Sequence, residues 1–156
     1  MGAKEQILEG IQKFEGQAGI YYRNLETGEA WGYREKEPYL AASIVKLPLM
    51  AAILHWRAQG RTSFDEPVTI LDSQKVPGCG AVQFLNGDIT LTVGELSKLM
   101  ITLSDNTATN GLFRHYGAAA VHEAFLELGM IGTQFNREYW DEERENRGIN
   151  NYFVPE

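Results

Sequence analysis

The sequence has little of several features that would assign it to common classes of protein. It contains one cysteine, Cys79, so it cannot form an internal disulfide. It carries 14 basic against 21 acidic residues, with a net charge of -7 and no cluster of Lys and Arg, which argues against a nucleic-acid-binding surface. The three histidines lack the spacing of metal ligands, and no glycine-rich stretch has the form of a phosphate-binding loop. We therefore expect no metal or organic cofactor.

Long hydrophobic runs are also missing. No apolar run is long enough to cross a membrane, and the first five residues lack the apolar stretch of a signal peptide. These observations do not assign a cellular compartment: the protein would be extracytoplasmic if a leader was removed, and cytoplasmic otherwise. The chain has 156 residues, 44% of them hydrophobic and 22% charged, which is the composition of a globular domain with a core.

The first quarter of the chain predicts a helix and a hairpin. Apolar residues recur at helical spacing over residues 7–14. Residues 19–25 and 30–33 have the pattern of two strands joined by a turn. No third strand stands out in the rest of the sequence, although two strands alone are marginally stable in water. The exposed edge of such a hairpin is a template for pairing. We therefore expect the chain to associate with itself or with a separate C-terminal fragment.

The remainder predicts a mainly helical region. The pattern becomes helical at Ser43 and stays so, apart from a loop over residues 72–87 that contains proline and glycine. Thr92 and Glu95 have the spacing of a capping box at the start of a helix. Further helices are predicted up to Gly117 and Gly129, and the tail from residue 132 is predicted to be polar and irregular.

Ser43 and Lys46 stand three positions apart in the apolar run LAASIVKLPLMAAIL. Positions i and i+3 share one face of a helix, so the amine can reach the hydroxyl. A serine is a weak nucleophile until a base removes its proton, and a lysine among apolar neighbours has a lowered pKa that suits it for this task. The structural alternative is that Ser43 caps a helix and Lys46 extends to solvent. Since Ser-x-x-Lys occurs by chance in about half of chains this long, the pair alone does not distinguish a catalytic role from a structural one.

A second motif, Ser104-Asp105-Asn106, falls at a break between two predicted helices, where side chains can project into a cleft. Asp and Asn are also good N-cap residues, so a capped loop explains the tripeptide equally well in isolation. The tripeptide is expected by chance in only roughly a few per cent of such chains. Ser-x-x-Lys followed by Ser-Asp-Asn is the paired signature of penicillin-recognising serine enzymes.

With these motifs, the chain resembles class A β-lactamases and their β-lactamase-like serine hydrolase relatives. The resemblance runs over nearly all of the sequence and includes the segments LETGEAWGYR, AASIVKLPLMAAIL, TLTVGELSKLMITLSDNTATN and LELGM. It implies an α+β fold of the β-lactamase/transpeptidase type. Residues 43–156 would form a mainly helical domain, and residues 1–42 would supply the first helix and hairpin of a sheet domain.

The resemblance also implies roles for individual residues. Ser43 would be the nucleophile that a β-lactam or a peptidoglycan-like amide acylates, and its backbone N–H would be half of the oxyanion hole. Lys46 would be the acylation base or its proton relay. Ser104 would pass a proton to the leaving nitrogen, and Asn106 would bind the acylamide side chain of the substrate.

Two further residues are implied to support this site. Asp105 would brace its loop without taking part in the chemistry. Asn110 follows Asn106 by four positions, on the same helix face, and would hold the loop after Gly132.

The resemblance is incomplete at the C-terminal end. No Lys-Thr-Gly tripeptide follows Ser104, whereas in the family that strand binds the substrate carboxylate and supplies the second oxyanion donor. Family members also continue for further strands and a final helix beyond the equivalent of Glu156. We therefore expect a truncated fragment that is inactive alone, because the loss of one oxyanion donor already costs about a hundredfold in rate.

The sequence also leaves open which residue would activate the water that removes the acyl group. Family β-lactamases use a glutamate in the context E-x-x-L-N, but the corresponding region here reads NREYWDEERENRGINNY. Asp141, Glu142 and Glu143 are candidates by position, or none of them serves, since a charge run is usually a solvated face. Without a base the protein would behave as a penicillin-binding protein or D,D-peptidase with slow deacylation. A non-catalytic binding remnant is the remaining alternative.

Cys79 lies in the segment VPGCGAVQF, which the resemblance places at the border of the cleft. A cysteine nucleophile with His55, His115 or His122 as its base is a competing interpretation. No cysteine-hydrolase context surrounds Cys79, however, and the histidines are better explained as surface or helix-packing residues.

Overall fold

A computed structural model describes residues 2–156 of the chain. The chain divides into two compact units. One unit ends at Tyr39 and also includes Val154–Glu156, and the other is Leu40–Phe153. In the described residues, no helix has the length and apolar character needed to span a membrane.

The smaller unit contains the predicted helix and hairpin. Helix α1 (Ala3–Gln12) is followed by strands β1 (Ile20–Arg23) and β2 (Ala30–Tyr33), which pair antiparallel. Tyr22 lies opposite Trp31, and their rings stack with centroids 5.8 Å apart. The turn forms because the side-chain oxygen of Asn24 accepts hydrogen bonds from two backbone N–H groups of the following residues.

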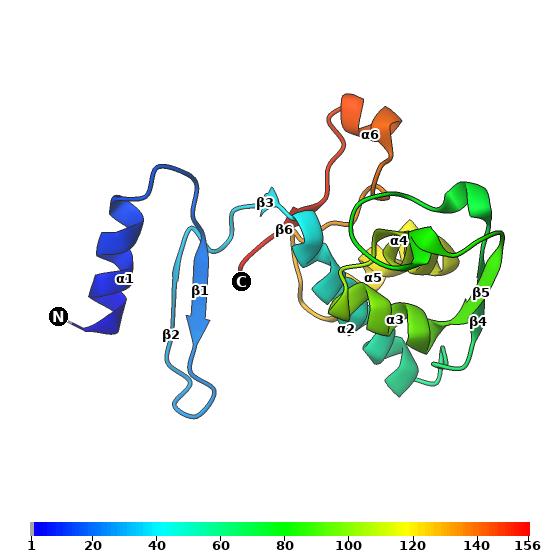
Figure 1. The fold of residues 1–156 in the computed structure, drawn as a ribbon. Helices are drawn as coiled ribbons and strands as arrows, with labels where there is room; N and C mark the ends of the chain where they lie inside the picture. Colours follow the sequence, from blue (N-terminus) through cyan, green and yellow to red (C-terminus); the bar gives the residue numbers. More distant parts are fainter. Residues whose placement is uncertain (1) are drawn as a thin grey trace. The chain divides into compact units, whose positions relative to one another are not determined.

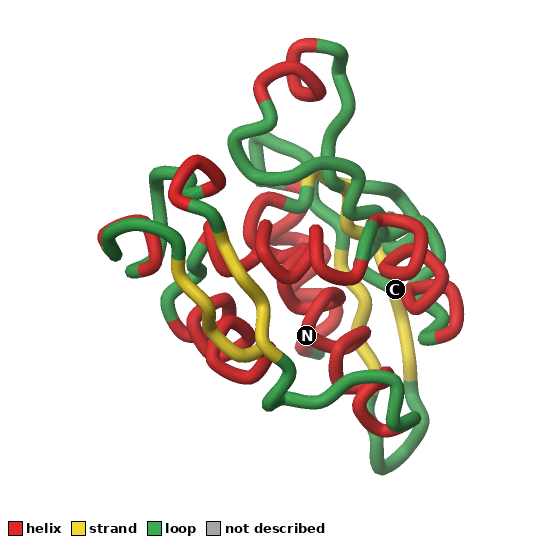
Figure 2. Tube along the Cα trace, turned by 90° about the vertical axis from the view of Figure 1, so that its right-hand side faces the viewer, coloured by secondary structure: helices red, strands yellow, loops and turns green. Residues whose placement is uncertain are grey.

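The larger unit is built on helices that pack around one core. Helix α2 packs against α3 and α5, and α4 packs against α3, α5 and a strand (Figure 1). Helix α4 is the most buried, and Leu49 and Ile53 of α2 and Leu112 of α4 are fully enclosed. A short helix, α6, projects away from this group in both views (Figures 1 and 2). The helices of this unit are α2 (Lys46–Ala58), α3 (Val93–Thr102), α4 (Asn106–Tyr116), α5 (Ala118–Glu127) and α6 (Glu142–Asn146).

Local signals explain where these helices begin and end. The capping box is confirmed: the Thr92 hydroxyl accepts the Glu95 N–H at 3.1 Å, and the Glu95 carboxylate accepts the Thr92 N–H at 2.7 Å. Gly117 and Gly129 follow α4 and α5 with φ of 82° and 77°, a conformation that favours glycine.

The expectation that no further strand follows the first hairpin is wrong. Strands β4 (Pro67–Ile70) and β5 (Ile89–Thr92) pair antiparallel on either side of the predicted loop. Val68 and Ile70 are buried, whereas Thr69 and Thr90 face outward and hydrogen-bond at 2.9 Å. Four residues of alternation are too few to stand out between helical patterns, so only the cross-strand pairing defines these strands.

The remaining elements are short. The loop between β4 and β5 contains two single turns of 3₁₀-helix, and another such turn leads into α2. The tail was expected to be irregular, but it forms α6 and a strand that pairs with β3. These elements are η1 (Ala42–Val45), η2 (Asp72–Gln74), η3 (Val82–Phe84), β3 (Tyr39–Leu40) and β6 (Tyr152–Phe153).

Candidate active site

Ser43 lies in the η1 turn that feeds directly into α2, and its side chain is exposed. The preceding residue, Ala42, has φ of +38°, which is an uncommon backbone conformation for a residue with a side chain. Pro48 is the third residue of α2. Since N–H groups in the first helical turn have no partner within the helix, the proline is tolerated there.

Lys46 is the first residue of α2, and its side chain runs inward beneath Ser43. Only 2% of the residue is exposed. The ammonium nitrogen lies 3.3 Å from the Ser43 hydroxyl oxygen and 2.9 Å from the amide oxygen of Asn106. It also lies 2.7 Å from the backbone carbonyl oxygen and 2.8 Å from the hydroxyl oxygen of Ser104. Every one of these acceptors is uncharged.

This environment changes the proton affinity of the lysine. Burial lowers the pKa of Lys46 to about 8, although the nearby Cys79 and Asp105 oppose the shift. At neutral pH roughly a tenth of the molecules would then carry a neutral amine, which is hundreds of times the fraction expected for a free lysine. A neutral amine within hydrogen-bond distance of a serine hydroxyl can accept its proton.

Ser104 reaches the same point from the break between α3 and α4. Its hydroxyl donates to the Ser43 hydroxyl oxygen at 3.0 Å, so Ser43, Lys46 and Ser104 form a closed triangle of contacts. Ser104 has φ of +53°. This left-handed conformation, which costs a non-glycine residue roughly 1–3 kcal/mol, allows its carbonyl and its hydroxyl to meet the same ammonium group.

Asp105 points away from this triangle and organises the loop. It is 1% exposed, and one carboxylate oxygen accepts the N–H groups of Ala81 and Val82 at 2.7 and 2.9 Å. The other oxygen accepts the N–H of Ala108 at 2.9 Å and so caps α4. Gly80 passes so close that a Cβ there would lie 2.2 Å from the Asp105 carboxyl carbon.

Asn106 links the lysine to the loop before it. Its amide oxygen accepts from Lys46, and its amide nitrogen donates to the Pro77 carbonyl at 3.2 Å. Its backbone N–H donates to the Cys79 carbonyl at 3.0 Å. The side chain is therefore held in place, with one edge at the site.

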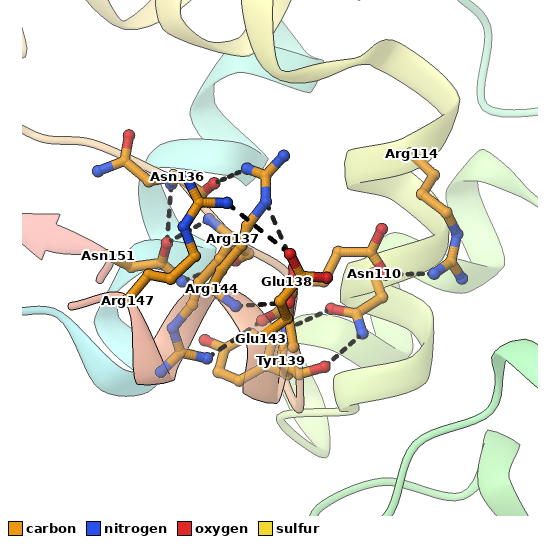
Figure 3. A network of polar contacts seen from close by, with 11 residues as sticks. Asn110, Arg114, Asn136, Arg137, Glu138, Tyr139, Glu143, Arg144, Arg147 and Asn151 are labelled. Carbon is orange, nitrogen blue, oxygen red and sulfur yellow. Dashed lines mark hydrogen bonds and ion pairs between the residues drawn. The ribbon is translucent and has the colours of Figure 1, made fainter. Parts of the chain in front are cut away.

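Asn110 lies one turn further along α4 and is fully buried. Its side chain makes two hydrogen bonds with the backbone of Tyr139: the amide donates to the carbonyl at 2.9 Å, and the Tyr139 N–H returns a bond to the amide oxygen at 2.8 Å (Figure 3). The sequence prediction placed Asn110 against the loop after Gly132, and the contact lies within that segment.

Sequence reasoning missed Tyr139, which completes the site. Its ring centroid lies 4.4 Å from the Lys46 ammonium nitrogen, and its hydroxyl donates to the Ala42 carbonyl at 2.8 Å. Burial raises the pKa of Tyr139 to about 12, opposed by contact with Ser43, so the phenol stays neutral well above pH 7. The signal in the sequence that could have indicated Tyr139 was an aromatic residue within a charged tail.

The three candidate bases of the tail are directed elsewhere. Asp141 caps α6 by accepting the Arg144 N–H at 3.0 Å. Glu143 is 86% exposed at its side chain and pairs with Arg147 at 3.8 Å (Figure 3). Glu142 is exposed on the same short helix. Another half-buried carboxylate of the segment, Glu138, is engaged by Arg114. Burial raises its pKa, and Arg114 opposes that shift.

The competing cysteine–histidine arrangement is not assembled. His55 contacts Glu127 at 2.8 Å, His115 contacts Glu66 at 3.1 Å, and His122 contacts the Phe135 carbonyl at 3.0 Å. Each histidine thus links helices or loops, while Cys79 is exposed in the loop near Lys46. Residues 2–156 contain no group of three or more His, Cys, Asp or Glu side chains that could hold a metal ion.

The family model described as "Beta-lactamase enzyme family" matches residues 2–156. The chain belongs to this family. It is 33% identical to a beta-lactamase of Rhodobacter capsulatus over 139 residues, which cover 85% of the chain and 47% of that protein. Two solved structures each superpose on 97% of the chain. One is a PBP-A mutant in an acyl-enzyme complex with penicillin G (28% identity, TM-score 0.85, 56% of that chain covered). The other is an ancestral class A beta-lactamase (29% identity, TM-score 0.82, 58% covered).

These similarities confirm the expected α+β fold of the β-lactamase family. The chain spans about half the length of the curated relatives it matches. Identical residues account for about a third of the aligned positions in these comparisons.

Proposed function

We propose that Ser43 is the nucleophile of a serine hydrolase and that a β-lactam, or a related peptidoglycan-like amide, acylates it. The observation that carries this proposal is the triangle of Ser43, Lys46 and Ser104. It joins an exposed hydroxyl to a buried amine whose pKa is lowered to about 8. The acyl-enzyme described for the PBP-A mutant shows that such chemistry exists on this fold.

In the proposed acylation, the Ser43 oxygen attacks the β-lactam carbonyl carbon while its proton passes to the neutral Lys46 amine. The proton then moves through the Ser104 hydroxyl to the ring nitrogen, and the C–N bond breaks. Because the ring opens without losing a fragment, the product is an ester on Ser43 that retains the whole penicillin. Asn106 would hold the acylamide group, and Asp105 and Asn110 would support the site.

Intact mass spectrometry after incubation with penicillin G tests this proposal. We expect a mass gain equal to one whole penicillin, and peptide mapping should place it on Ser43. Ser43→Ala should abolish the gain, whereas Ser73→Ala, which alters an exposed serine on η2, should retain it. An adduct on any other residue would refute the assignment.

A slowly deacylating, penicillin-binding activity is the second candidate, and the position of Tyr139 favours it. The neutral phenol lies beside Ser43 and Lys46, while Asp141 and Glu143 are engaged in contacts within their own segment. Time courses of the adduct would distinguish the two candidates: a persistent ester indicates penicillin binding, and rapid loss indicates a β-lactamase.

We further propose that the 156 residues alone turn over β-lactams at most slowly. They contain no Lys-Thr-Gly tripeptide, and a missing oxyanion donor costs about a hundredfold or more in rate. Association with a second copy or with a C-terminal segment would supply further sheet. Nitrocefin hydrolysis at an ordinary enzymatic rate by the purified chain would contradict this expectation.

A further inference from the structure

Tyr139 contacts Lys46 and the residue directly before Ser43. Its ring lies against the Lys46 ammonium group, with 4.4 Å from the nitrogen to the ring centroid. Its hydroxyl donates to the carbonyl of Ala42, the residue directly before Ser43, at 2.8 Å. One side chain from the tail therefore touches the base and the backbone that presents the nucleophile.

The ring is held there by independent contacts. Asn110 binds the Tyr139 backbone through both its N–H and its carbonyl. The edge of the ring meets the fully buried Phe135 at a centroid distance of 6.3 Å. The neighbouring Glu138 is tied to Arg114 on α4. A side chain fixed in this way loses little further entropy when it contacts Lys46.

We propose that Tyr139 is a positioning residue that holds Lys46 against Ser43 and shields the lysine amine from water. This inference rests on the proposed function, because it assigns Tyr139 a role only through the Ser43–Lys46 pair. The hydroxyl bond to Ala42 has a second effect: it holds a residue with φ of +38° in the conformation that directs Ser43 toward the amine.

The shielding has a chemical consequence for Lys46. The ionisable groups that face its amine are Cys79, Asp105 and Tyr139. An aromatic face attracts an ammonium group, but it solvates the charge less well than the water it displaces. The ring therefore increases the fraction of neutral amine, which is the form that can accept the Ser43 proton.

The first measurement uses the unaltered chain. In an NMR spectrum of chain labelled at the lysine ε-methylene groups, the Lys46 signal, assigned by its loss in Lys46→Arg, should be shifted upfield by the ring current of Tyr139. A titration should then give its pKa. An unshifted Lys46 signal would overturn the proposal whatever the variants do.

The second measurement uses a matched pair of tyrosines. Tyr139→Ala should admit water and raise the pKa of Lys46 by about one unit toward its ordinary value. Tyr116→Ala should leave it unchanged, although Tyr116 is also half-buried, in ring contact with Trp56 and hydrogen-bonded through its hydroxyl. Tyr139→Phe keeps the ring and should also leave the Lys46 pKa unchanged.

The outcomes separate this inference from the proposed function. An unchanged pKa in a folded Tyr139→Ala variant, or an equal shift in Tyr116→Ala, would overturn the positioning role. If Tyr139→Ala does not fold, the ring-current shift and the Tyr139→Phe titration decide the question. None of these measurements needs a substrate, so a failure of penicillin to label Ser43 would count against the proposed function alone.

Discussion

The ammonium nitrogen of Lys46 lies 2.7 Å from the carbonyl oxygen and 2.8 Å from the hydroxyl oxygen of Ser104, although 58 positions separate the two residues. The first contact uses a backbone carbonyl that lies at the break between α3 and α4. The second places a proton acceptor and donor beside the lysine. Together they explain how a buried lysine is satisfied without a carboxylate partner. Its proton is weakly held because the amine is buried.

The stability of the chain should increase with pH because of Lys46. Its pKa is lowered in the folded state, so the unfolded state binds more protons between about pH 8 and 10.5, and the free energy of unfolding rises through that window. Between pH 7 and 9.5 this contribution should be about 2 kcal/mol. Tyr139 acts in the opposite direction only above about pH 10, because its pKa is raised on folding.

Urea unfolding across this range checks the prediction. Lys46→Met should lose the rise, whereas Lys98→Met, an exposed lysine on α3, should retain it. Parallel pH profiles for the unaltered chain and Lys46→Met would contradict a lowered pKa for Lys46.

Asp105→Asn should destabilise the larger unit strongly. The carboxylate accepts three backbone N–H groups, and an amide at the same place must turn an NH₂ group toward at least one of them. We expect a loss of about 3 kcal/mol, measured by urea unfolding. Asp141→Asn is the matched control. Asp141 caps α6 near the surface by accepting one N–H, so its substitution should cost less than about 1 kcal/mol. Equal losses would argue against the bracing role of Asp105.

Gly80→Ala should be far more damaging than Gly87→Ala. Both glycines have positive φ, of 110° and 67°, so both substitutions strain the backbone. At Gly80 the new methyl group would also collide with Asp105, 2.2 Å from its carboxyl carbon and 2.5 Å from its Cα, whereas nothing lies within 4 Å at Gly87. Thermal unfolding should show a cost of about 1 kcal/mol at Gly87 and at least about 3 kcal/mol at Gly80. Similar melting temperatures would show that the loop can move away.

Asn110→Ala should release the Tyr139 backbone. Both hydrogen bonds between the two residues would be lost, and each is worth about 1 kcal/mol. Amide hydrogen exchange at Tyr139 should accelerate at least about tenfold. Asn146→Ala, at an exposed position of α6, should leave exchange at Tyr139 unchanged. Retained protection in Asn110→Ala would mean that the tail is held mainly by other contacts.

Parts of the fold could be predicted because the interactions that define them are local. The Thr92–Glu95 capping box and the glycines after α4 and α5 join residues that are close in sequence. The β4–β5 hairpin was missed because its strands are only four residues long and become strands by pairing across a long loop.

The sequence by itself identified the residues that we propose to be reactive. It placed Ser43 and Lys46 one turn apart and put the Ser-Asp-Asn tripeptide at a helix break, since short-range spacing and capping decide both features. Only the tertiary structure decided that Ser104 and Asn106 meet the buried amine and that Tyr139, rather than Asp141 or Glu143, lies against it. Those contacts join distant segments through burial and hydrogen bonding, and no local pattern encodes which distant side chain fills the space beside a buried charge.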